Sequence, residues 1–346
     1  MKVLVCSDFD SVMNKGHNNP EFQFFPPENV EKIESKFEVV WNKTGRKLTK
    51  EELIEKVADC DAVITCWQSN MFDEEVIANA PKLKLLAHFA GSVAPYVSEA
   101  LYDKGIKVIG ANDMMFAESV AEGAIAYMLC SQRKIKQIQK HMENRAEGWV
   151  ESKKDPFKRG ILYKTVGIVS FGAIGEHLAR LLQPFGCKIK VYSRNISEEK
   201  LQKYNMQRAS LEEIFSTCDI ISLHTAWNKH TEKMINRDLL KLIKDDALLV
   251  NTARGQIIDE EALADELETG RFSAALDVFW QEPLPSESRL YGLDNVLIMP
   301  HNGGPTPDLY KHIASSLIDE MYDYLENGAP LRSEIPKSKG LSMTLA

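Results

Sequence analysis

The chain has 346 residues, of which 44% are hydrophobic and 27% are charged, a balance typical of globular proteins. Because chains beyond ~250–300 residues usually split into domains, we expect two. The net charge of −8 argues against a general attraction to nucleic acid. The one basic run, from Arg133 to Lys140, is interpreted as the charged face of a helix.

The cysteines and apolar runs indicate the compartment. The six cysteines include no C-x-x-C pair, which favours reduced thiols over disulfides or a zinc site. The apolar stretch at the N-terminus is too short for a signal peptide. No uninterrupted apolar run approaches the ~18 residues of a membrane span. We therefore expect a cytoplasmic protein that binds no metal and has neither a membrane nor a nucleic acid as partner.

The first part of the chain alternates short apolar segments with helical patterns. Strands are predicted at 3–6, 37–41, 62–65, 83–89 and 106–109, and helices at 28–36, from Thr49 onward, at 73–79 and at 97–104. The segment 20–27, with three phenylalanines, is interpreted as a loop. Fully apolar strands that alternate with helices predict a doubly wound parallel α/β sheet.

A second α/β pattern follows a predicted long helix at 119–143 and a polar arm at 144–164 that carries Trp149. Its strands are predicted at 166–169, 188–192, 220–224, 247–251, 273–276 and 296–299, and a final helix at 308–327. The polar residues from Lys337 onward are expected to be loose. The sequence therefore predicts two α/β domains, and the pattern alone assigns the last helix to neither.

A glycine-containing turn joins the first strand of the second domain to a helix. Gly172 and Gly175 hold the second and third positions of the G-x-G-x-x-G fingerprint, and Ser170 occupies the first. The backbone N–H groups around Ala173 and Ile174 would face a diphosphate at the helix N-terminus. A glycine turn of an ordinary α/β protein is the alternative, but the flanking strand and helix favour a dinucleotide site.

The end of the next strand, 188–192, bears on the choice of cofactor. An acidic residue there would accept hydrogen bonds from the ribose diol of NAD, but the strand is followed by Ser193 and Arg194. Arg194 can pair with a 2′-phosphate. We therefore predict a preference for NADP(H), with NAD(H) also possible if Arg194 only covers the adenine.

Three reactive side chains follow apolar strands of the second domain. Arg254 lies where α/β sheets bind ligands, and its guanidinium could hold a substrate carboxylate; a salt-bridged structural arginine is the alternative. Glu282 and His301 end successive loops, so they could meet. An isolated histidine after a strand is more often structural. A carboxylate partner stabilises the protonated imidazole and fixes its tautomer, which suits a proton donor.

The turn after the fourth strand of the first domain contains Gly91 and Ser92. Its free backbone N–H groups could form a nest for an anion. An ordinary turn is the alternative.

The order of these segments resembles the D-isomer-specific 2-hydroxyacid dehydrogenase family. The segments are the Gly-x-x-Gly turn, Asn-Thr-Ala-Arg-Gly at 251–255, Leu-Asp-Val-Phe-x-x-Glu-Pro at 276–283 and Pro-His-Asn-Gly-Gly at 300–304, and the likeness runs from about Lys82 to Thr306. It implies an oxidoreductase that transfers a hydride between a nicotinamide cofactor and a small 2-keto or 2-hydroxy acid of D stereochemistry. It also implies two doubly wound parallel-sheet domains, Rossmann-like or flavodoxin-like, with the active site in the cleft between them.

The resemblance implies roles for individual residues. Arg254 would bind the substrate carboxylate and polarise the keto oxygen, His301 would be the acid/base, and Glu282 its partner. Asp277 would hold the nicotinamide carboxamide. The implied cofactor contacts are Gly172, Ala173, Ile174, Gly175, Ser193, Arg194, Thr225, Thr231, Ala253 and Asp277, and the implied substrate contacts are Gly91, Ser92 and Arg254.

The resemblance also implies an organisation. A substrate-binding domain, 1–117, would be completed by the C-terminal helix, 307–330, and 118–306 would form the dinucleotide-binding domain. Residues 119–160 would form a homodimer contact.

Some features depart from the family pattern. Ser170 replaces a glycine, which is acceptable if its backbone stays unstrained, and the turn after Gly91 lacks the usual acidic or amide residue. Glyoxylate or hydroxypyruvate suits an NADPH-linked reductase, while pyruvate and bulkier keto acids stay open, with Trp280 and Tyr96 as candidates for shaping the pocket. Formate, phosphite or 3-phosphoglycerate is a further possibility, although no basic residue adjoins Gly91. A nucleotide-dependent corepressor on the same scaffold is the non-enzymatic alternative.

Overall fold

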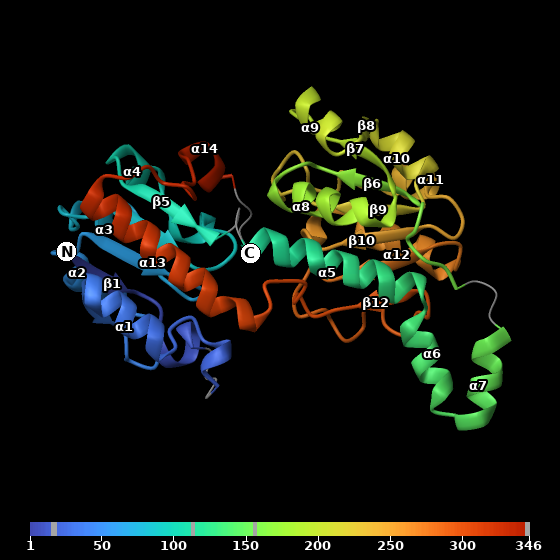
Figure 1. Ribbon diagram of the computed structural model, residues 1–346, viewed down its shortest axis with the longest axis horizontal. Helices are drawn as coiled ribbons and strands as arrows, with labels where there is room; N and C mark the ends of the chain where they lie inside the picture. The colour runs from blue at the N-terminus through green and yellow to red at the C-terminus, as the bar shows by residue number, and fades with distance from the viewer. Residues whose placement is uncertain (15–18, 112–114, 155–157, 343–346) are drawn as a thin grey trace. The chain divides into compact units, whose positions relative to one another are not determined.

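The computed structural model describes residues 1–14, 19–111, 115–154 and 158–342. The chain divides into two compact units (Figure 1), and each contains one parallel sheet. Unit 1 comprises Met1–Ala117 and Pro305–Ala346, and unit 2 comprises Glu118–Gly304. No helix among the described residues is both long and apolar enough to cross a membrane.

Unit 1 is a five-stranded sheet of order β2-β1-β3-β4-β5 with helices on both faces. Its elements are β1 (Lys2–Val5), η1 (Phe9–Met13), η2 (Pro20–Phe22), α1 (Pro27–Lys36), β2 (Glu38–Trp41), α2 (Lys50–Val57), β3 (Ala62–Thr65), α3 (Glu74–Ala78), β4 (Leu85–His88), η3 (Ala94–Tyr96), α4 (Glu99–Asp103), β5 (Lys107–Gly110), η7 (Pro307–Leu309), α13 (Tyr310–Asn327) and α14 (Lys337–Gly340). All strand pairs of this sheet are parallel, as predicted.

The strands of unit 1 are apolar throughout because both faces of the sheet are buried. Along β1, Val3 and Val5 point into one core, and Leu4 points into the core on the opposite face. Phe24 and Phe25, from the loop before α1, are fully buried in the first of these cores. The period-2 alternation of side chains therefore fills two cores from one strand.

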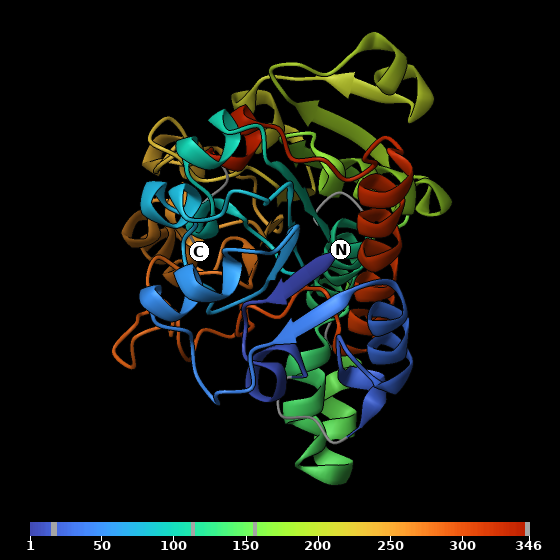
Figure 2. The same cartoon turned by 90° about the vertical axis from the view of Figure 1, so that its left-hand side faces the viewer.

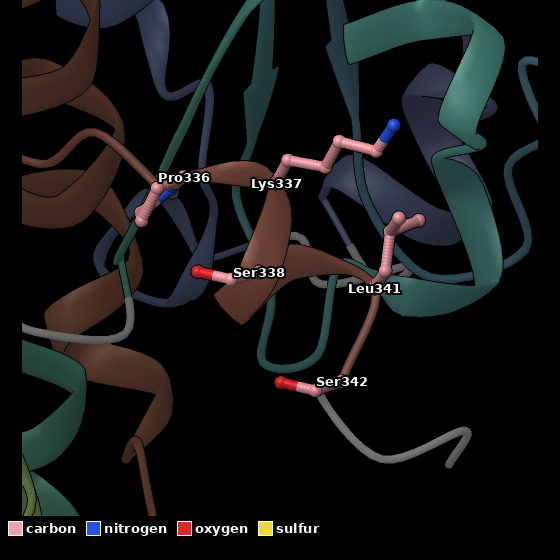
Figure 3. Close-up of a pocket in the computed structure, with 5 residues that line it drawn as sticks. All are labelled: Pro336, Lys337, Ser338, Leu341 and Ser342. Atoms are coloured by element: carbon pink, nitrogen blue, oxygen red, sulfur yellow. The ribbon is translucent and has the colours of Figure 1, made fainter.

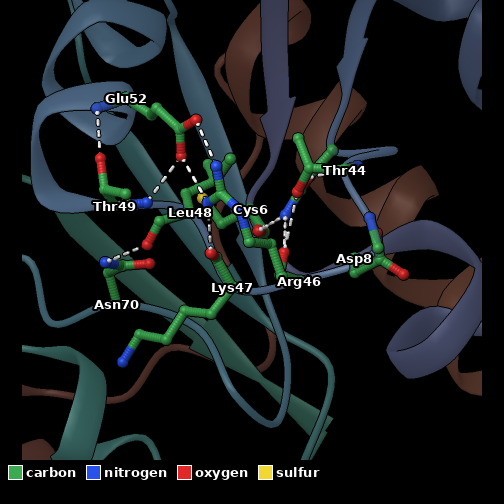
Figure 4. Close-up of polar contacts among 11 residues, drawn as sticks. Cys6, Asp8, Thr44, Arg46, Lys47, Leu48, Thr49, Glu52 and Asn70 are labelled. Atoms are coloured by element: carbon green, nitrogen blue, oxygen red, sulfur yellow. Dashed lines mark hydrogen bonds and ion pairs between the residues drawn. The ribbon is translucent and has the colours of Figure 1, made fainter.

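Polar side chains fix the loops of unit 1 at the helix starts. The hydroxyl of Thr49 accepts from the N–H of Glu52, whose carboxylate accepts from the Thr49 N–H in return, which makes a capping box at α2. Arg46 binds both oxygens of Glu52 at 2.8 Å (Figure 4). Gly45 of the same loop donates its N–H at 2.7 Å to the carboxylate of the buried Asp8, which lies after β1. These contacts hold the loop before α2 in one conformation.

The C-terminal segment returns to unit 1. Helix α13 packs beside α1 (Figures 1 and 2). The buried carboxylate of Glu320 accepts from the N–H groups of Arg332 and Ser333, and the chain then bridges Ile109 of the edge strand in an antiparallel sense through Glu334. The expectation of a loose tail from Lys337 is therefore wrong up to residue 342. Helix α14 forms there and lines a shallow pocket (Figure 3).

Unit 2 is a seven-stranded sheet of order β12-β11-β10-β9-β6-β7-β8. Its elements are α5 (Met115–Gln132, whose first turn belongs to unit 1), α6 (Ile135–Met142), α7 (Arg145–Lys154), β6 (Thr165–Val169), α8 (Ala173–Leu182), η5 (Gln183–Phe185), β7 (Lys188–Tyr192), α9 (Glu198–Lys203), β8 (Met206–Arg208), α10 (Leu211–Thr217), β9 (Ile220–Leu223), α11 (Arg237–Leu242), β10 (Leu248–Asn251), η6 (Gly255–Ile257), α12 (Glu260–Glu268), β11 (Ser273–Leu276) and β12 (Val296–Ile298). The sequence predicted every strand except β8, whose residues are mostly polar and exposed.

The predicted long helix at 119–143 is wrong as a single element. It breaks at Lys134, whose φ of 52° is left-handed, and continues as α6. The predicted polar arm contains a further helix, α7, which packs against α6. A Cβ at Gly148 would collide with the carbonyl oxygen of His141, so glycine permits this close approach. Helices α6 and α7 form a hairpin that projects from the rest of unit 2 (Figures 1 and 2).

The sheet of unit 2 sets the position of the functional loops. Leu248 and Val250 of β10 point into the core beneath α5 and α8, whereas Leu249 points into the core formed with α10, α11 and α12. All pairs in this sheet are parallel. The carboxyl ends of its strands therefore share one edge, where open α/β sheets bind ligands.

Candidate functional site

The glycine turn between β6 and α8 has the geometry of an anion site. A Cβ at Gly175 would lie 2.8 Å from the carbonyl oxygen of Ser170, so the third glycine is required for close packing. A Cβ at Gly172 would meet open space. Gly172 is the N-cap of α8, so the N–H groups of the first helical turn, from Ala173 and Ile174, face outward without a side-chain cap.

Ser170 does not keep the unstrained backbone expected of a serine at the first glycine position. Its φ is 73°, in the left-handed region that a side chain disfavours. Its N–H donates to the carbonyl of Tyr192, and its hydroxyl pairs with that of Thr225 at 2.8 Å. These two contacts hold the serine in a conformation that glycine would adopt freely. Thr225 is thereby brought to the glycine turn.

The segment that follows β7 carries Arg194, whose guanidinium is available for binding. Ser193 is partly exposed and Arg194 is exposed. No hydrogen bond or ion pair of Arg194 forms within the described part of the chain. The nearby Arg208, in contrast, donates to the carbonyl of Ile196 and to Glu198, both at 3.0 Å. Arg194 is thus free to pair with an anion.

The loop after β10 shapes the backbone around Arg254. The Asn251 side chain accepts from the N–H of Ala253 at 3.0 Å and donates to the carbonyl of Arg254 at 2.9 Å. A Cβ at Gly255 would collide with the backbone of Phe279, so the Arg254 loop lies directly against the loop that carries Glu282.

The guanidinium of Arg254 is mostly enclosed by the protein. Burial lowers the pKa of Arg254, and the carboxylate of Glu282 opposes that shift. One terminal nitrogen donates to the carbonyl of Ala253 at 2.6 Å, and Nε is buried without a partner. Among the described residues Arg254 forms no ion pair within salt-bridge distance, so they give no support to the alternative interpretation of a salt-bridged structural arginine, and its role toward a substrate stays a prediction.

His301 and Glu282 meet, as their positions after successive strands suggested. Nδ1 of His301 lies 2.7 Å from Oε2 of Glu282, and Oε1 accepts from the Phe279 N–H at 3.1 Å. Burial acts to raise the pKa of Glu282, but its hydrogen bonds with His301 and Phe279 outweigh burial and lower it. With Nδ1 engaged, Nε2 is the ring nitrogen left to exchange a proton.

The carboxylate of Asp277 already accepts hydrogen bonds from other groups of the protein. Its buried carboxylate accepts from the hydroxyl of Tyr127 at 3.0 Å and from the N–H groups of Asn302 at 3.0 Å and Gly303 at 2.9 Å. Its role toward a nicotinamide carboxamide stays a prediction.

Several buried polar atoms at this edge have no hydrogen-bond partner among the described residues. They are Nδ1 of His224 after β9, and Oγ1 of Thr252 and Nε of Arg254 after β10. Most buried polar atoms in proteins are hydrogen-bonded. Orphaned polar atoms beside an uncapped helix N-terminus therefore fit a polar ligand that adds hydrogen bonds, as a nicotinamide dinucleotide would.

The remaining predicted contacts have local roles. The hydroxyl of Thr231 accepts from the Asn228 N–H at 2.8 Å and donates to the carbonyl of Ala226 at 2.7 Å, so it shapes the loop after β9. Trp280 has the ammonium of Lys233 5.1 Å from its ring.

In unit 1, Gly91 and Ser92 follow β4, and the hydroxyl of Ser92 is buried without a partner. The ring of Tyr96 lies against that of His88, with the two centroids 4.8 Å apart and the rings tilted by 30°. The part that Gly91 and Ser92 play toward a substrate stays a prediction.

Sequence reasoning missed several polar residues of this edge. Asn251 was visible as part of the Asn-Thr-Ala-Arg-Gly segment, but its contacts depend on the loop conformation. Tyr127 lies within the predicted long helix and was not among the expected site residues. Its one signal was a hydroxyl at a core position, because buried hydroxyls need partners.

Comparisons with known proteins agree with this geometry. Residues 125–303 match the family described as D-isomer specific 2-hydroxyacid dehydrogenase, NAD binding domain. A glyoxylate reductase of Pyrococcus furiosus is 35% identical over 286 residues, which cover 81% of this chain and 84% of that protein.

Solved structures share the fold. An acyclic imino acid reductase in complex with NADPH and D-Arg has a TM-score of 0.74 at 26% identity, covering 97% of this chain and 100% of that one. D-mandelate dehydrogenase from Rhodotorula graminis has a TM-score of 0.79 at 24% identity, covering 97% and 98%, and supports the fold alone. With the family match spanning half of the chain, the protein belongs to the D-isomer-specific 2-hydroxyacid dehydrogenase family and is a nicotinamide-dependent oxidoreductase.

Proposed function

We propose that this protein reduces a small 2-keto acid, with glyoxylate or hydroxypyruvate as the favoured substrate and NADPH as the favoured reductant. The observation that carries the proposal is the pair of His301 and Glu282, 2.7 Å apart, in a loop cluster that also contains Arg254. The name of the Pyrococcus furiosus relative, glyoxylate reductase, supports the substrate class.

When bound, the nicotinamide cofactor would supply the hydride that the keto carbon of the substrate gains. Nε2 of protonated His301 donates its proton to the keto oxygen, which completes the 2-hydroxy acid. Glu282 holds Nδ1, so the ring keeps one orientation and tautomer through the transfer. Arg254 binds the substrate carboxylate and stabilises the negative charge that develops on the keto oxygen.

The remaining contacts follow from the loops around this centre. The N–H groups of the first turn of α8, together with Ser170 and Thr225, would hold the diphosphate of the cofactor. The buried atoms without partners, from His224 and Thr252, would gain hydrogen bonds from it. The backbone N–H groups at Gly91 and Ser92 would add to the binding of the substrate carboxylate.

The free guanidinium of Arg194 supports the preference for NADPH. We expect Arg194→Gln to raise the KM for NADPH by about tenfold, since one charge-assisted hydrogen-bond pair is lost. The KM for NADH in the same variant provides the control, because NADH lacks the 2′-phosphate. Equal changes for the two cofactors would reject Arg194 as the discriminating residue.

The hairpin of α6 and α7 is the proposed contact of a homodimer. Its exposed apolar side chains include Ile135, Trp149 and Val150, each more than half exposed, and such patches favour association. Trp149→Glu should convert the dimer to a monomer in sedimentation measurements. Tyr291→Glu, at an exposed aromatic residue of a different loop, is the matched control. A dimer that survives Trp149→Glu would contradict the proposed contact.

The proposed compartment is the reducing cytosol. All six cysteines are free thiols, and three of them have a pKa raised by burial to about 11 or above. Such thiols are poorly reactive, which is consistent with a structural role.

The deciding experiment follows nicotinamide absorbance with glyoxylate, hydroxypyruvate, pyruvate and a branched 2-keto acid, each with NADPH and with NADH. Turnover of glyoxylate or hydroxypyruvate, faster with NADPH, is the expected result. If only the bulkier acids were turned over, the proposed substrate would be wrong. If NADH were preferred, the proposed cofactor would be wrong. Nucleotide binding without turnover of any 2-keto acid would reject the proposed reaction.

A further inference from the structure

Asp277 holds the loop that carries His301. It accepts hydrogen bonds from three consecutive backbone N–H groups of that loop. The carbonyl of Asp277 accepts from the His301 N–H at 2.9 Å. The two carboxylate oxygens of Asp277 accept from the N–H groups of Asn302 at 3.0 Å and Gly303 at 2.9 Å. A single aspartate at the end of β11 thus fixes the backbone of residues 301–303.

This attachment matters because His301 has an unfavourable backbone. Its φ of 52° lies in the left-handed region, which a residue with a side chain seldom adopts unless its surroundings impose it. An unattached loop would relax to an extended conformation and turn the imidazole away from Glu282. The three hydrogen bonds to Asp277 are the surroundings that impose the conformation.

Helix α5 lies against the other side of the loop. A Cβ at Gly123 would collide with the carbonyl oxygen of Gly303, and a Cβ at Gly304 would lie 2.7 Å from the N atom of Val120. A Cβ at Gly303 would lie 2.8 Å from the Asp277 carboxylate. The loop therefore runs between α5 and Asp277 with no room for side chains, and glycine is needed on both sides.

One side chain of α5 reaches across this contact. Tyr127 is 7% exposed, and its hydroxyl lies 3.0 Å from Oδ1 of Asp277 and 3.3 Å from the side-chain oxygen of Asn302. Oδ1 is also the oxygen that accepts from the Asn302 N–H. The Tyr127 hydroxyl thus donates to the atom that holds the residue next to His301.

We propose that Tyr127 is a positioning residue for the acid/base histidine: its hydroxyl orients the Asp277 carboxylate, and Asp277 keeps His301 in the left-handed conformation that meets Glu282. This inference rests on the proposed function, because it takes His301 as the proton donor. Tyr127 touches neither substrate nor cofactor in this role. A purely structural tyrosine would contribute to the stability of unit 2 and leave the imidazole unchanged.

The test is Tyr127→Phe, which removes only the hydroxyl. Tyr204→Phe is the matched control, because Tyr204 is also 7% exposed and donates to a carboxylate, Glu176, at 3.0 Å in another part of unit 2. We expect Tyr127→Phe to lower kcat by about tenfold, the effect of losing one hydrogen bond to a charged group. The KM for the keto acid should stay within about twofold, because ground-state binding is not affected.

A readout independent of turnover is the nitrogen NMR spectrum of the His301 imidazole in the protein without ligand, assigned with His301→Gln. In Tyr127→Phe the Nδ1 resonance should move away from its wild-type position, because a ring that leaves Glu282 loses the hydrogen bond at Nδ1. Tyr204→Phe should leave this resonance unchanged. An unchanged Nδ1 resonance and an unchanged kcat in Tyr127→Phe would overturn the proposal.

A second variant covers the case in which Tyr127→Phe does not fold. Gly123→Ala adds one methyl group against the carbonyl of Gly303 and should displace the same loop, with the same change in the Nδ1 resonance of His301. If the wild type reduces no 2-keto acid, the proposed function fails. The NMR comparison still decides whether Tyr127 positions His301.

Discussion

The carboxyl edges of the two sheets present histidines in contrasting settings. In unit 1, β4 ends at His88, which is fully buried; its Nδ1 lies 3.0 Å from the hydroxyl of Thr65, and Nε2 lacks a partner. In unit 2, His301 follows β12 with its side chain 39% exposed and held by Glu282. His88 is the last residue of an apolar parallel strand and His301 follows one, so the local sequence pattern hardly distinguishes them.

The difference lies in what surrounds each ring. Burial lowers the pKa of His88 to about 3, so this imidazole stays neutral at physiological pH and cannot supply a proton there. The half-buried His224 after β9 behaves alike, with a pKa lowered by desolvation to about 4. A histidine at the edge of a sheet becomes a candidate acid only when a loop brings it into contact with solvent and a carboxylate.

The largest effect should come from His301→Ala. We expect kcat for a 2-keto acid to fall about a thousandfold, since general acid catalysis is lost, while the Kd for the nucleotide stays unchanged. His312→Ala, at an exposed histidine of α13, is the control and should keep full activity. If turnover by His301→Ala stayed within about tenfold of the wild type, His301 would not be the proton donor. It would then be a structural histidine, as His88 is.

The next largest effect should come from Arg254→Lys. An ammonium cannot reproduce the paired hydrogen bonds of a guanidinium on a carboxylate, so we expect kcat/KM to fall about a hundredfold, with a raised KM. The control is Arg271→Lys, because Arg271 binds Glu266 and the carbonyls of Leu240 and Ile243 and has a purely structural setting. That variant should lower the melting temperature and leave kcat/KM unchanged. Near-normal kinetics for Arg254→Lys would show that Arg254 does not bind the substrate carboxylate and has a structural role.

A smaller effect concerns pH. The unfolded chain binds protons at His88 and His224 below about pH 6.5, whereas the folded pKa values are about 3 and about 4. Stability is therefore complete above pH 6.5 and is lost as the pH falls toward the folded values, by roughly 1.4 kcal/mol per pH unit for each histidine.

Urea unfolding of wild type and His88→Asn between pH 7 and pH 5 measures this loss. The variant is expected to be less stable overall but to have a shallower dependence on pH, because one of the two titrating groups is gone. Equal slopes for the two proteins would show that His88 is not buried in its neutral form.

The smallest effect concerns the left-handed backbone of Ser170, which parallels that of His301. Ser170→Val should lower the free energy of unfolding by about 1–2 kcal/mol, because a β-branched side chain is unfavourable at positive φ. Ser170→Gly, which accepts this conformation, is the matched variant, and its melting temperature should be at least as high as that of Ser170→Val. A Ser170→Val protein as stable as the wild type would argue against the left-handed turn.

The sequence by itself determined the two parallel α/β patterns and the order of the reactive segments. Fully apolar strands indicate burial on both faces, and residues after such strands share an edge, so the sequence pattern already groups Arg254, Glu282 and His301. The resemblance of the motifs to one family was also readable, because the spacing of whole segments is specific.

Tertiary structure alone decided the features that depend on contacts between distant segments. The break at Lys134 has no glycine or proline to announce it, and β8 has no apolar run because it lies at the edge of the sheet. The hydroxyl of Tyr127 meets Asp277, 150 residues away in the chain. Such contacts follow from how helices and loops pack on a sheet, and local hydrophobic periodicity carries no information about them.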